Sequence, residues 1–221
     1  MNIGSSISVV VPVFNEEENI CPLAQEIGSE LKGICDYEII FVNDCSTDDT
    51  VVTLTKLKNE ISEIRVIHHS QRSGQSAGLR TGILAAKNNI IVTLDGDGQN
   101  DPADIPSLLK KYEQSHDTHF AMVTGHRVKR KDSWAKRYAS KIANTVRANL
   151  LKDDTPDTGC GLKLFPKNLF LRLPYFDHIH RFLPALAKRE GCSIFVVPVN
   201  HRHRKHGVSK YATFQRLVVG I

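Results

Sequence analysis

The feature that most constrains the fold of this chain is an apolar run near its N-terminus, SISVVVPVF at residues 6–14. Valine and isoleucine dominate this run, and no charged residue interrupts it. A strand with one face in water alternates apolar and polar residues, whereas a strand covered on both faces is apolar throughout. The run therefore predicts a central strand of a sheet that carries helices on both faces.

Strand-like and helix-like segments alternate through the first half of the chain. Strands are predicted at residues 37–44, 64–69 and 90–94. Helices are predicted from Asn15 to about Gly33, from Ser46 or Thr47 onward, over 74–88, and from Pro102 to Tyr112, with Asn15 and Ser46 or Thr47 as the capping residues. This rhythm predicts an α/β fold with a mostly parallel sheet flanked by helices and joined by right-handed crossovers.

The second half of the chain is less regular. Strands are predicted at 120–128 and 192–201, a short strand or turn at 159–166, a basic amphipathic helix at 134–151, and a helix at 180–191 that Pro184 is expected to kink. No repeat or flexible linker divides the chain, so we expect one domain with two lobes, at about 6–115 and about 116–210. Residues 211–221 are predicted to be either a short terminal helix or the start of a membrane-associated segment.

Composition narrows the functional classes only slightly. The 221 residues include 29 Lys and Arg against 24 Asp and Glu, which gives a formal net charge of +5. This charge is compatible with nucleic acid, anionic lipid or phosphorylated substrates. The five cysteines contain no CxxC pair, which indicates a reducing compartment and not a disulfide framework or a zinc site. There is neither a signal peptide nor an apolar run of the ~18 residues that a spanning helix needs, so we expect a cytoplasmic location.

Polar side chains gather where the predicted strands end. Asn15 and Glu16 follow the first strand, Asn43 and Asp44 end the second, and Asp95 and Asp97 end the fourth. The carboxyl ends of parallel strands lie at one edge of a sheet, where such folds bind their ligands. We therefore expect these side chains to share one site.

The DGDG run after the fourth strand is the most informative of these clusters. Asp95 and Asp97 supply hard oxygen ligands, and the glycines let the backbone turn sharply. Mg²⁺ or Mn²⁺ held by few carboxylates keeps positions open for phosphate oxygens and water, and Gln99 is a further oxygen donor. A capped turn without a metal is the alternative. A calcium loop of the EF-hand type is excluded, because Pro106 stands where a glutamate would be required.

Glycine recurs every fourth residue at Gly74, Gly78 and Gly82. A phosphate-binding loop is one interpretation, but the GK[ST] ending of such loops is missing. The favoured interpretation is a helix face of small residues that packs closely on the sheet.

Three runs, VVVPVFNEEENI, FVNDCSTDDT and LDGDGQNDP, resemble the successive signatures of family-2 glycosyltransferases with the Rossmann-like GT-A fold. Two later runs, DTGCGLKLF and HRKHGVSKY, are similar to those of polyprenyl-phosphate sugar transferases, a group that includes the dolichyl-phosphate mannosyltransferases. The resemblance extends from about Ser6 to Tyr211, and five motifs in the right order are much more specific than any one alone. It implies that the first lobe binds a nucleotide sugar and the second lobe the acceptor.

The resemblance implies a role for each matching position. Pro12, Phe14, Glu16, Asp44 and Asp95 are expected at the nucleotide, Asp95, Asp97 and Gln99 at Mg²⁺ or Mn²⁺ on the diphosphate, and Asp97, Arg127, Arg137 and Arg204 in catalysis. Apart from the resemblance, Arg72 is a candidate at the nucleotide because it lies near the start of the helix predicted at 74–88, and Asp157 is a further catalytic candidate. Ser209 and Lys210 belong to a loop expected to close over the donor. Many relatives have two aspartates where this chain has Asn43-Asp44, so no preference between uracil and guanine is inferred.

Basic residues crowd two segments, 127–147 and 202–210. A solvated surface is the ordinary role of such residues, and nucleic-acid binding is disfavoured because few aromatic side chains are interleaved for base stacking. Arginine suits phosphate groups through its bidentate geometry, which favours binding of a diphosphate and an acceptor phosphate. His201, His203 and His206 have no cysteine or carboxylate beside them, so a metal cluster there is disfavoured.

Asp157 admits several roles. It is the natural general base if the acceptor is a sugar hydroxyl. A lipid phosphate, with a second pKa near ~6, is already largely dianionic, and Asp157 would then orient groups. A cap or turn residue before Gly159 is the purely structural alternative.

Together these features predict an inverting, metal-dependent transfer of a sugar from a nucleoside-diphosphate sugar to dolichyl or undecaprenyl phosphate, at the cytoplasmic face of a membrane. Basic residues of the acceptor lobe are expected to dock on the membrane surface. The alternatives are transfer to a hydroxyl of a soluble or growing glycan, and a non-catalytic nucleotide-sugar-binding module. No nucleic-acid partner is expected, and the oligomeric state is left open.

Overall fold

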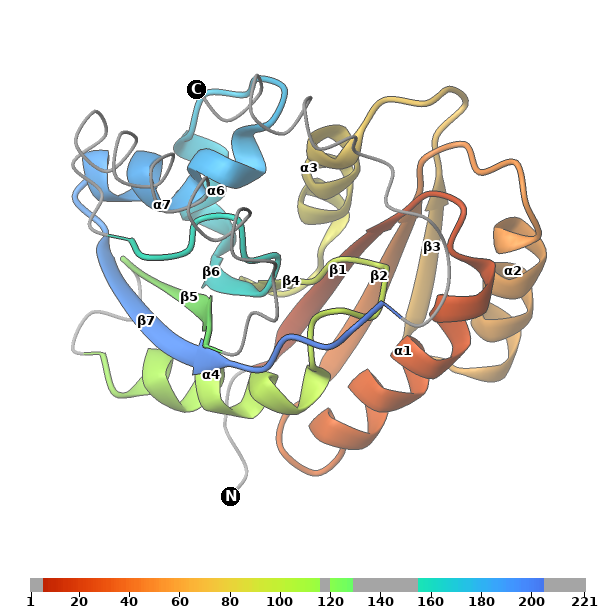
Figure 1. Cartoon of the computed structure of the whole chain (residues 1–221), viewed down its shortest axis with the longest axis horizontal. Helices are drawn as coiled ribbons and strands as arrows, with labels where there is room; N and C mark the ends of the chain where they lie inside the picture. Colours follow the sequence, from red (N-terminus) through yellow and green to blue (C-terminus); the bar gives the residue numbers. More distant parts are fainter. Residues whose placement is uncertain (1–5, 116–119, 129–154, 205–221) are drawn as a thin grey trace.

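The computed structural model of the chain describes residues 6–115, 120–128 and 155–204, and its centre is one seven-stranded sheet (Figure 1). The strand order is β3-β2-β1-β4-β6-β5-β7. The strands are β1 (Ile7–Val13), β2 (Tyr37–Asn43), β3 (Ile64–His68), β4 (Ile90–Thr93), β5 (Ala121–Arg127), β6 (Lys163–Pro166) and β7 (Ser193–Val199). β1 to β4 run parallel, β5 pairs in parallel with β7, and β6 is antiparallel to both of its neighbours. The predicted mostly parallel α/β sheet is confirmed.

Helices cover both faces of the sheet (Figure 1). One face carries α1 (Glu17–Leu31), α2 (Thr50–Glu60) and α4 (Ile105–Glu113), the last preceded by the 3₁₀ turn η1 (Pro102–Asp104). The other face carries α3 (Gln75–Ala85), α6 (Lys167–Arg172) and α7 (Ile179–Arg189), with Pro184 inside α7. The basic helix predicted at 134–151 lies outside the described residues.

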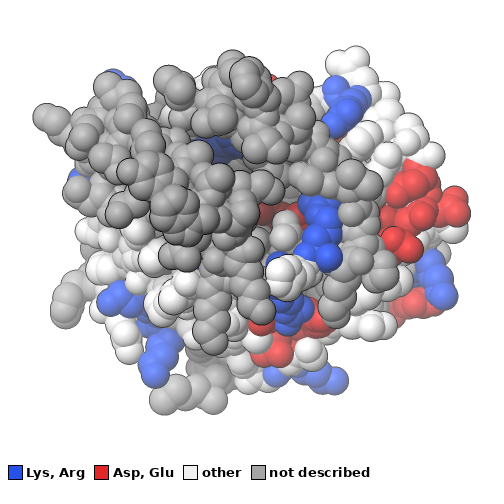
Figure 2. Space-filling model, viewed as in Figure 1, with Lys and Arg blue, Asp and Glu red and all other residues white. Residues whose placement is uncertain are grey.

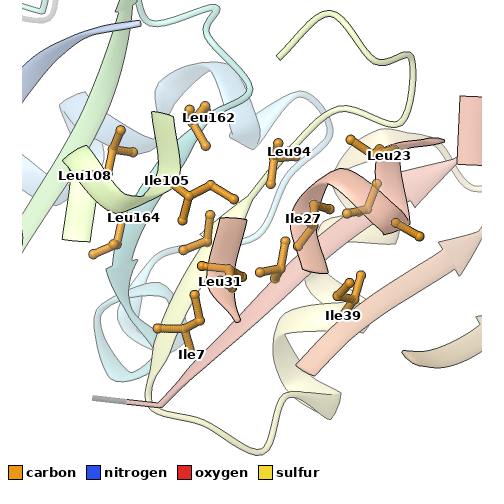
Figure 3. Packing of buried hydrophobic residues seen from close by; sticks show 14 of the residues in the cluster. Ile7, Leu23, Ile27, Leu31, Ile39, Leu94, Ile105, Leu108, Leu162 and Leu164 are labelled. Carbon is orange, nitrogen blue, oxygen red and sulfur yellow. The ribbon is translucent and has the colours of Figure 1, made fainter. Parts of the chain in front are cut away.

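The central strand explains why the first apolar run has no polar alternation. Ile7, Val9 and Val11 of β1 belong to the core under α1, whereas Val10 belongs to the core under α3. Figure 3 shows side chains from α1 and α4 together with sheet residues in the first of these cores. Full burial of such a side chain stabilises the fold by roughly 1.5–3 kcal/mol, so a strand buried on both faces is a strong determinant of the topology.

The glycines of α3 allow that helix to lie unusually close to the sheet. A Cβ on Gly78 would stand 2.9 Å from the Cβ of Pro12, and a Cβ on Gly82 would overlap the side chain of Val10. Gly74 precedes the helix with a left-handed φ of 89°, which a glycine adopts without strain. The predicted small-residue packing face is confirmed at Gly78 and Gly82.

Two predicted helix caps are wrong. Asn15 has a φ of 53°, and Glu16, not Asn15, occupies the N-cap position of α1. The Asn15 Oδ1 atom instead accepts a hydrogen bond of 2.8 Å from the backbone N–H of Thr47. Asp49, and neither Ser46 nor Thr47, occupies the N-cap position of α2. The capping side chains instead fasten the loop after β1 to the loop after β2.

Candidate active site

The loops after β1, β2 and β4 meet at the carboxyl edge of the sheet. Val13 pairs with Asn43 and Val10 with Thr93, so these strands end side by side. The chain leaves β1 toward β2 on one side and returns to β4 on the other, which is the switch point where open α/β sheets bind ligands. Acidic and basic side chains adjoin near the middle of the face seen in Figure 2. The predicted convergence of the three polar clusters is therefore present.

Asp44 organises the loop that leads into α3. Its carboxylate accepts hydrogen bonds from the backbone N–H groups of Ser73 (2.8 Å) and Gly74 (2.7 Å) and contacts His69 Nδ1 at 2.8 Å. Burial opposes ionisation, but the hydrogen bonds from His69 and the two backbone groups outweigh it and lower the pKa of Asp44. Asp44 is thus held as an anion at the end of β2.

Phe14 and Arg72 lie together beside Asp44's loop. The Arg72 guanidinium carbon stands 4.1 Å from the centroid of the Phe14 ring, which is cation–π geometry. Phe14 is partly exposed and Arg72 is exposed, whereas Pro12 is buried beneath Gly78 of α3. Of the predicted nucleoside-side residues, Phe14 and Arg72 therefore present surface, while Pro12 shapes the wall behind them.

Asp95 and Asp97 stand at the end of β4 in the predicted arrangement. Asp95 accepts a 2.7 Å hydrogen bond from Gln75 Nε2, and Asp97 accepts one of 2.5 Å from Arg204 Nη2. Burial and the neighbouring Asp97 carboxylate raise the pKa of Asp95 to about 6. A Cβ on Gly96 would overlap Val13, which explains why glycine separates the two aspartates.

This carboxylate pair fits a divalent cation. The Asp97 charge makes it harder for the buried Asp95 carboxyl to ionise, and a positive ion between the two carboxylates relieves that cost. Within residues 6–115, 120–128 and 155–204, no three His, Cys, Asp or Glu side chains are grouped to hold a metal. The donor set suits an ion that takes most of its ligands from phosphate and water, as Mg²⁺ does, and not a closed protein cage. Among the described residues, His201 and His203 are likewise not grouped with other side chains that could hold a metal. His206 lies outside the described residues.

Gln99 connects the Asp95–Asp97 turn to the segment after β7. Its backbone carbonyl accepts a 2.9 Å hydrogen bond from Arg202 N, and its Nε2 donates to the Arg202 carbonyl at 3.3 Å. The Arg202 guanidinium bonds Asp101 (2.6 Å) and Glu26 (2.5 Å). Arg202 is a residue whose role the sequence did not reveal: it fastens residues 200–204 across the front of the site.

Arg204 and Glu16 lie on the same side of the pair. Arg204 Nη1 is 3.8 Å from Glu16 Oε1, in addition to its bond to Asp97. Glu16 is buried and its Oε2 accepts a 2.8 Å hydrogen bond from Asn19 Nδ2. The guanidinium thus bridges the loop after β1 and the loop after β4.

A second charged group, Arg127 with Asp157, lies behind the aspartate pair. Arg127 Nε and Nη2 each donate to Asp157 at 2.7 Å, and the backbone N–H of Arg127 donates to it at 3.2 Å. Burial works against the cation, but the Asp157 bonds prevail and raise the pKa of Arg127. Asp157 therefore serves as an anchor for Arg127 in this structure.

Lys163 is a further buried cation that sequence reasoning missed. It is 3% exposed, its Nζ donates to the Cys160 carbonyl, and its charge acts on Asp95. Burial lowers the pKa of Lys163. A lysine inside the apolar run GLKLF was the available signal, since buried lysines are rare unless paired. Arg137, Ser209 and Lys210, also predicted for the site, lie outside the described residues.

Comparison with known families identifies the class of protein to which this fold and site belong. The chain belongs to the glycosyl transferase family 2, which it matches over residues 8–173. Solved structures share the GT-A fold: glucosyl-3-phosphoglycerate synthase from Mycobacterium tuberculosis, in complex with Mg²⁺ and uridine diphosphate, gives a TM-score of 0.75 over 98% of this chain and 78% of that one. Its sequence identity of 22% supports the fold alone.

Two curated relatives are more similar in sequence. The dodecaprenyl-phosphate galacturonate synthase of Rhizobium johnstonii is 33% identical over 210 residues, which cover 93% of this chain and 61% of the relative. The undecaprenyl-phosphate 4-deoxy-4-formamido-L-arabinose transferase of Enterobacter sp. is 32% identical, over 96% of this chain and 64% of the relative. The chain thus spans less than two thirds of the length of either relative. Among the described residues, no helix is both long and apolar enough to cross a membrane.

Proposed function

We propose that this chain transfers a sugar from a nucleoside-diphosphate sugar to a polyprenyl phosphate, with inversion at the anomeric carbon. The observation that carries the proposal is the meeting of Asp44, Asp95 and Asp97 at one edge of the sheet. This edge holds an anchored carboxylate, an exposed arginine over a partly exposed phenylalanine, and a pair of carboxylates that fits a cation. The two curated relatives, both named for polyprenyl phosphates, support the choice of acceptor.

The donor would lie along the ends of β1, β2 and β4. The nucleoside would meet Phe14 and Arg72, and the diphosphate would point to Asp95 and Asp97. A divalent cation held by these two aspartates would neutralise charge on the departing nucleoside diphosphate. Arg204, already at the edge of the pair, would supply a second positive charge to the phosphate oxygens.

The acceptor side favours a phosphate over a sugar hydroxyl. Asp157, the candidate base, is bound through both oxygens to Arg127, so its carboxylate is already engaged by a fixed cation and is poorly placed to receive a proton from a hydroxyl. A phosphomonoester with a second pKa near ~6 needs little proton removal at neutral pH. Its oxygen would attack the anomeric carbon as the bond from that carbon to the diphosphate breaks, releasing a nucleoside diphosphate and a polyprenyl monophosphate sugar.

The proposal is tested with a matrix of nucleotide sugars against polyprenyl phosphates, scored by lipid-linked product with and without Mg²⁺ or Mn²⁺. We expect product for one donor class, loss of product on chelation, and loss of product in the Asp95→Asn/Asp97→Asn double variant with the fold intact. Full activity of that double variant would overturn the cation assignment.

Two alternatives make different predictions. A glycosyltransferase that acts on a glycan hydroxyl would form product without lipid phosphate and would need Asp157 strictly. A non-catalytic binding module would be thermally stabilised by nucleotide sugars without releasing nucleoside diphosphate. The matrix separates the proposed function from both alternatives, and nucleoside-diphosphate release measured beside thermal stabilisation separates the two alternatives from each other.

A further inference from the structure

Gln75 is the first residue of α3 and is partly buried. Its Nε2 donates a 2.7 Å hydrogen bond to Asp95 Oδ1, across a separation of 20 residues. No motif in the sequence assigned a role to this side chain. Its partner is one of the two carboxylates that would hold the cation.

The backbone around Gln75 is fixed by contacts on both sides. The N–H groups of Ser73 and Gly74 donate to Asp44, and the next residue, Ser76, shares a 2.8 Å hydrogen bond between its Oγ and His180 Nδ1 of α7. Ser76 is 1% exposed, so the first turn of α3 is anchored on the nucleoside side and on the α7 side. The Gln75 amide is therefore placed at Asp95 by a rigid support.

The rest of the Asp95 environment complements this bond. The backbone N–H of Asp95 donates to Asn100 Oδ1 at 3.1 Å, and the backbone of Gly161 lies so close to the carboxylate that a Cβ there would overlap it. The Gln75 amide restrains Oδ1 of Asp95, and Gly161 packs against the same carboxylate. The carboxylate therefore has little room to rotate.

An amide suits this position because it donates without a charge. An arginine or lysine at the same place would bind Asp95 as a competing cation, as Arg204 binds Asp97. Partners behind a metal ligand that fix its orientation are known to matter nearly as much as the ligands themselves.

We propose that Gln75 is a positioning residue for the cation site, and that it holds Asp95 in the orientation that binds the metal–diphosphate complex. This inference rests on the cation site proposed at Asp95 and Asp97. It also makes the start of α3 a shared support, since Ser73 and Gly74, directly before the helix, hold Asp44 on the nucleoside side.

The test is Mn²⁺ binding, measured by electron paramagnetic resonance in the presence of UDP and, in a second series, GDP. Gln75→Met keeps the length of the side chain and removes its hydrogen-bond donor. Loss of such an orienting partner typically weakens metal binding about 10–100-fold, and we expect a weakening in this range. Gln71→Met, the same substitution at an exposed glutamine four residues earlier, is the matched control and should bind Mn²⁺ like the wild type.

A second readout separates positioning from general damage. Nucleotide affinity without a divalent cation depends on the nucleoside side and should be unchanged in Gln75→Met. Parallel loss of metal-free nucleotide affinity would indicate a merely structural role and overturn the inference, as would wild-type Mn²⁺ affinity. If Gln75→Met does not fold, Gln75→Asn takes its place, because its amide is one methylene too short to keep the bond.

The outcomes also distinguish this inference from the proposed function. If the wild-type protein binds no Mn²⁺ with either nucleotide, the proposed cation site itself is ruled out. Wild-type protein that binds Mn²⁺, together with an unaffected Gln75→Met variant, would leave the proposed function standing and remove only the role of Gln75.

Discussion

Arg127 of β5 forms a two-point ion pair with Asp157, in which Nε and Nη2 each donate to a different carboxylate oxygen at 2.7 Å. The side chains are 13% and 6% exposed, so the pair is shielded from water. Asp95 interacts electrostatically with Arg127, and Lys163 interacts with both Arg127 and Asp157. The Arg127–Asp157 ion pair therefore belongs to one charge network with Lys163 and Asp95. Its geometry is consistent with a fixed cation at the back of the site.

Asp157→Asn should destabilise the protein strongly, because it leaves the buried Arg127 without its counter-charge. Removal of one partner from a buried ion pair costs about 3–5 kcal/mol in the free energy of unfolding, measured by urea denaturation. Lys56→Met is the control, since Lys56 and Glu60 form an exposed pair at 3.9 Å that should contribute at most about 0.5 kcal/mol. Similar losses in both variants would show that Asp157 contributes no more than a surface charge.

Asp44 should make the protein sensitive to acid. Because its folded-state pKa is lowered, the unfolded state binds more protons in the range below about pH 4, and stability is lost as pH falls through the folded pKa. Asp44→Asn should flatten this acid slope of the unfolding free energy while lowering stability at neutral pH. Glu38 has a lowered pKa as well, so some slope will remain. Asp36→Asn, at an exposed position, should keep the wild-type slope; an equal flattening there would contradict the assignment.

The first half of the fold was predictable because its signals are local. An uninterrupted apolar strand such as β1 and a helix face of small residues such as that of α3 are written in consecutive or regularly spaced residues. The convergence of Asp44 with Asp95 followed from one further rule, that parallel strands end at the same edge. Local periodicity and topology together were sufficient for the core of the site.

The parts that sequence did not reveal depend on partners far along the chain. Asparagine is a residue type that often caps helices, yet the Asn15 side chain accepts a hydrogen bond from the backbone N–H of Thr47, 32 residues away. Gln75 and Arg202 are ordinary polar residues until the fold brings them to Asp95 and Asp101, and their partners lie 20 and 101 residues away. A capping preference of about 1 kcal/mol is small enough for such tertiary hydrogen bonds to override.

Two glycine substitutions should separate helix propensity from packing. Gly28→Ala in α1 places a Cβ 3.3 Å from the hydroxyl of Tyr37, whereas Gly82→Ala in α3 places one into Val10 and 3.1 Å from Val42 Cγ2. Alanine is favoured over glycine in a helix by about 1 kcal/mol, so Gly28→Ala should be neutral or stabilising. Gly82→Ala should lose about 1–3 kcal/mol through overpacking, seen as a lower thermal midpoint. Equal midpoints for the two variants would mean that α3 can move away from the sheet.

Asp95 should be a destabilising residue in the absence of a cation. Burial and Asp97 raise its folded-state pKa to about 6, so the folded state binds more protons than the unfolded state between about pH 4 and pH 6. By linkage, its contribution to stability falls as pH rises through this window and is most unfavourable at neutral pH. Asp95→Asn should therefore raise the unfolding free energy at pH 7, by at most about 2 kcal/mol because Asp95 as a residue is only half-buried. At a pH below both pKa values, the variant and the wild type should converge.

The same variant tests whether a cation reverses the effect. Mn²⁺ with a nucleoside diphosphate should raise the thermal midpoint of the wild type, because a ligand that binds only the folded state stabilises it by mass action. The midpoint of Asp95→Asn should respond much less, so the order of stability should invert when the cation is added. Asp36→Asn should respond like the wild type. An Asp95→Asn variant that is less stable than the wild type at neutral pH without metal would show that the Gln75 and Lys163 contacts already compensate the buried charge.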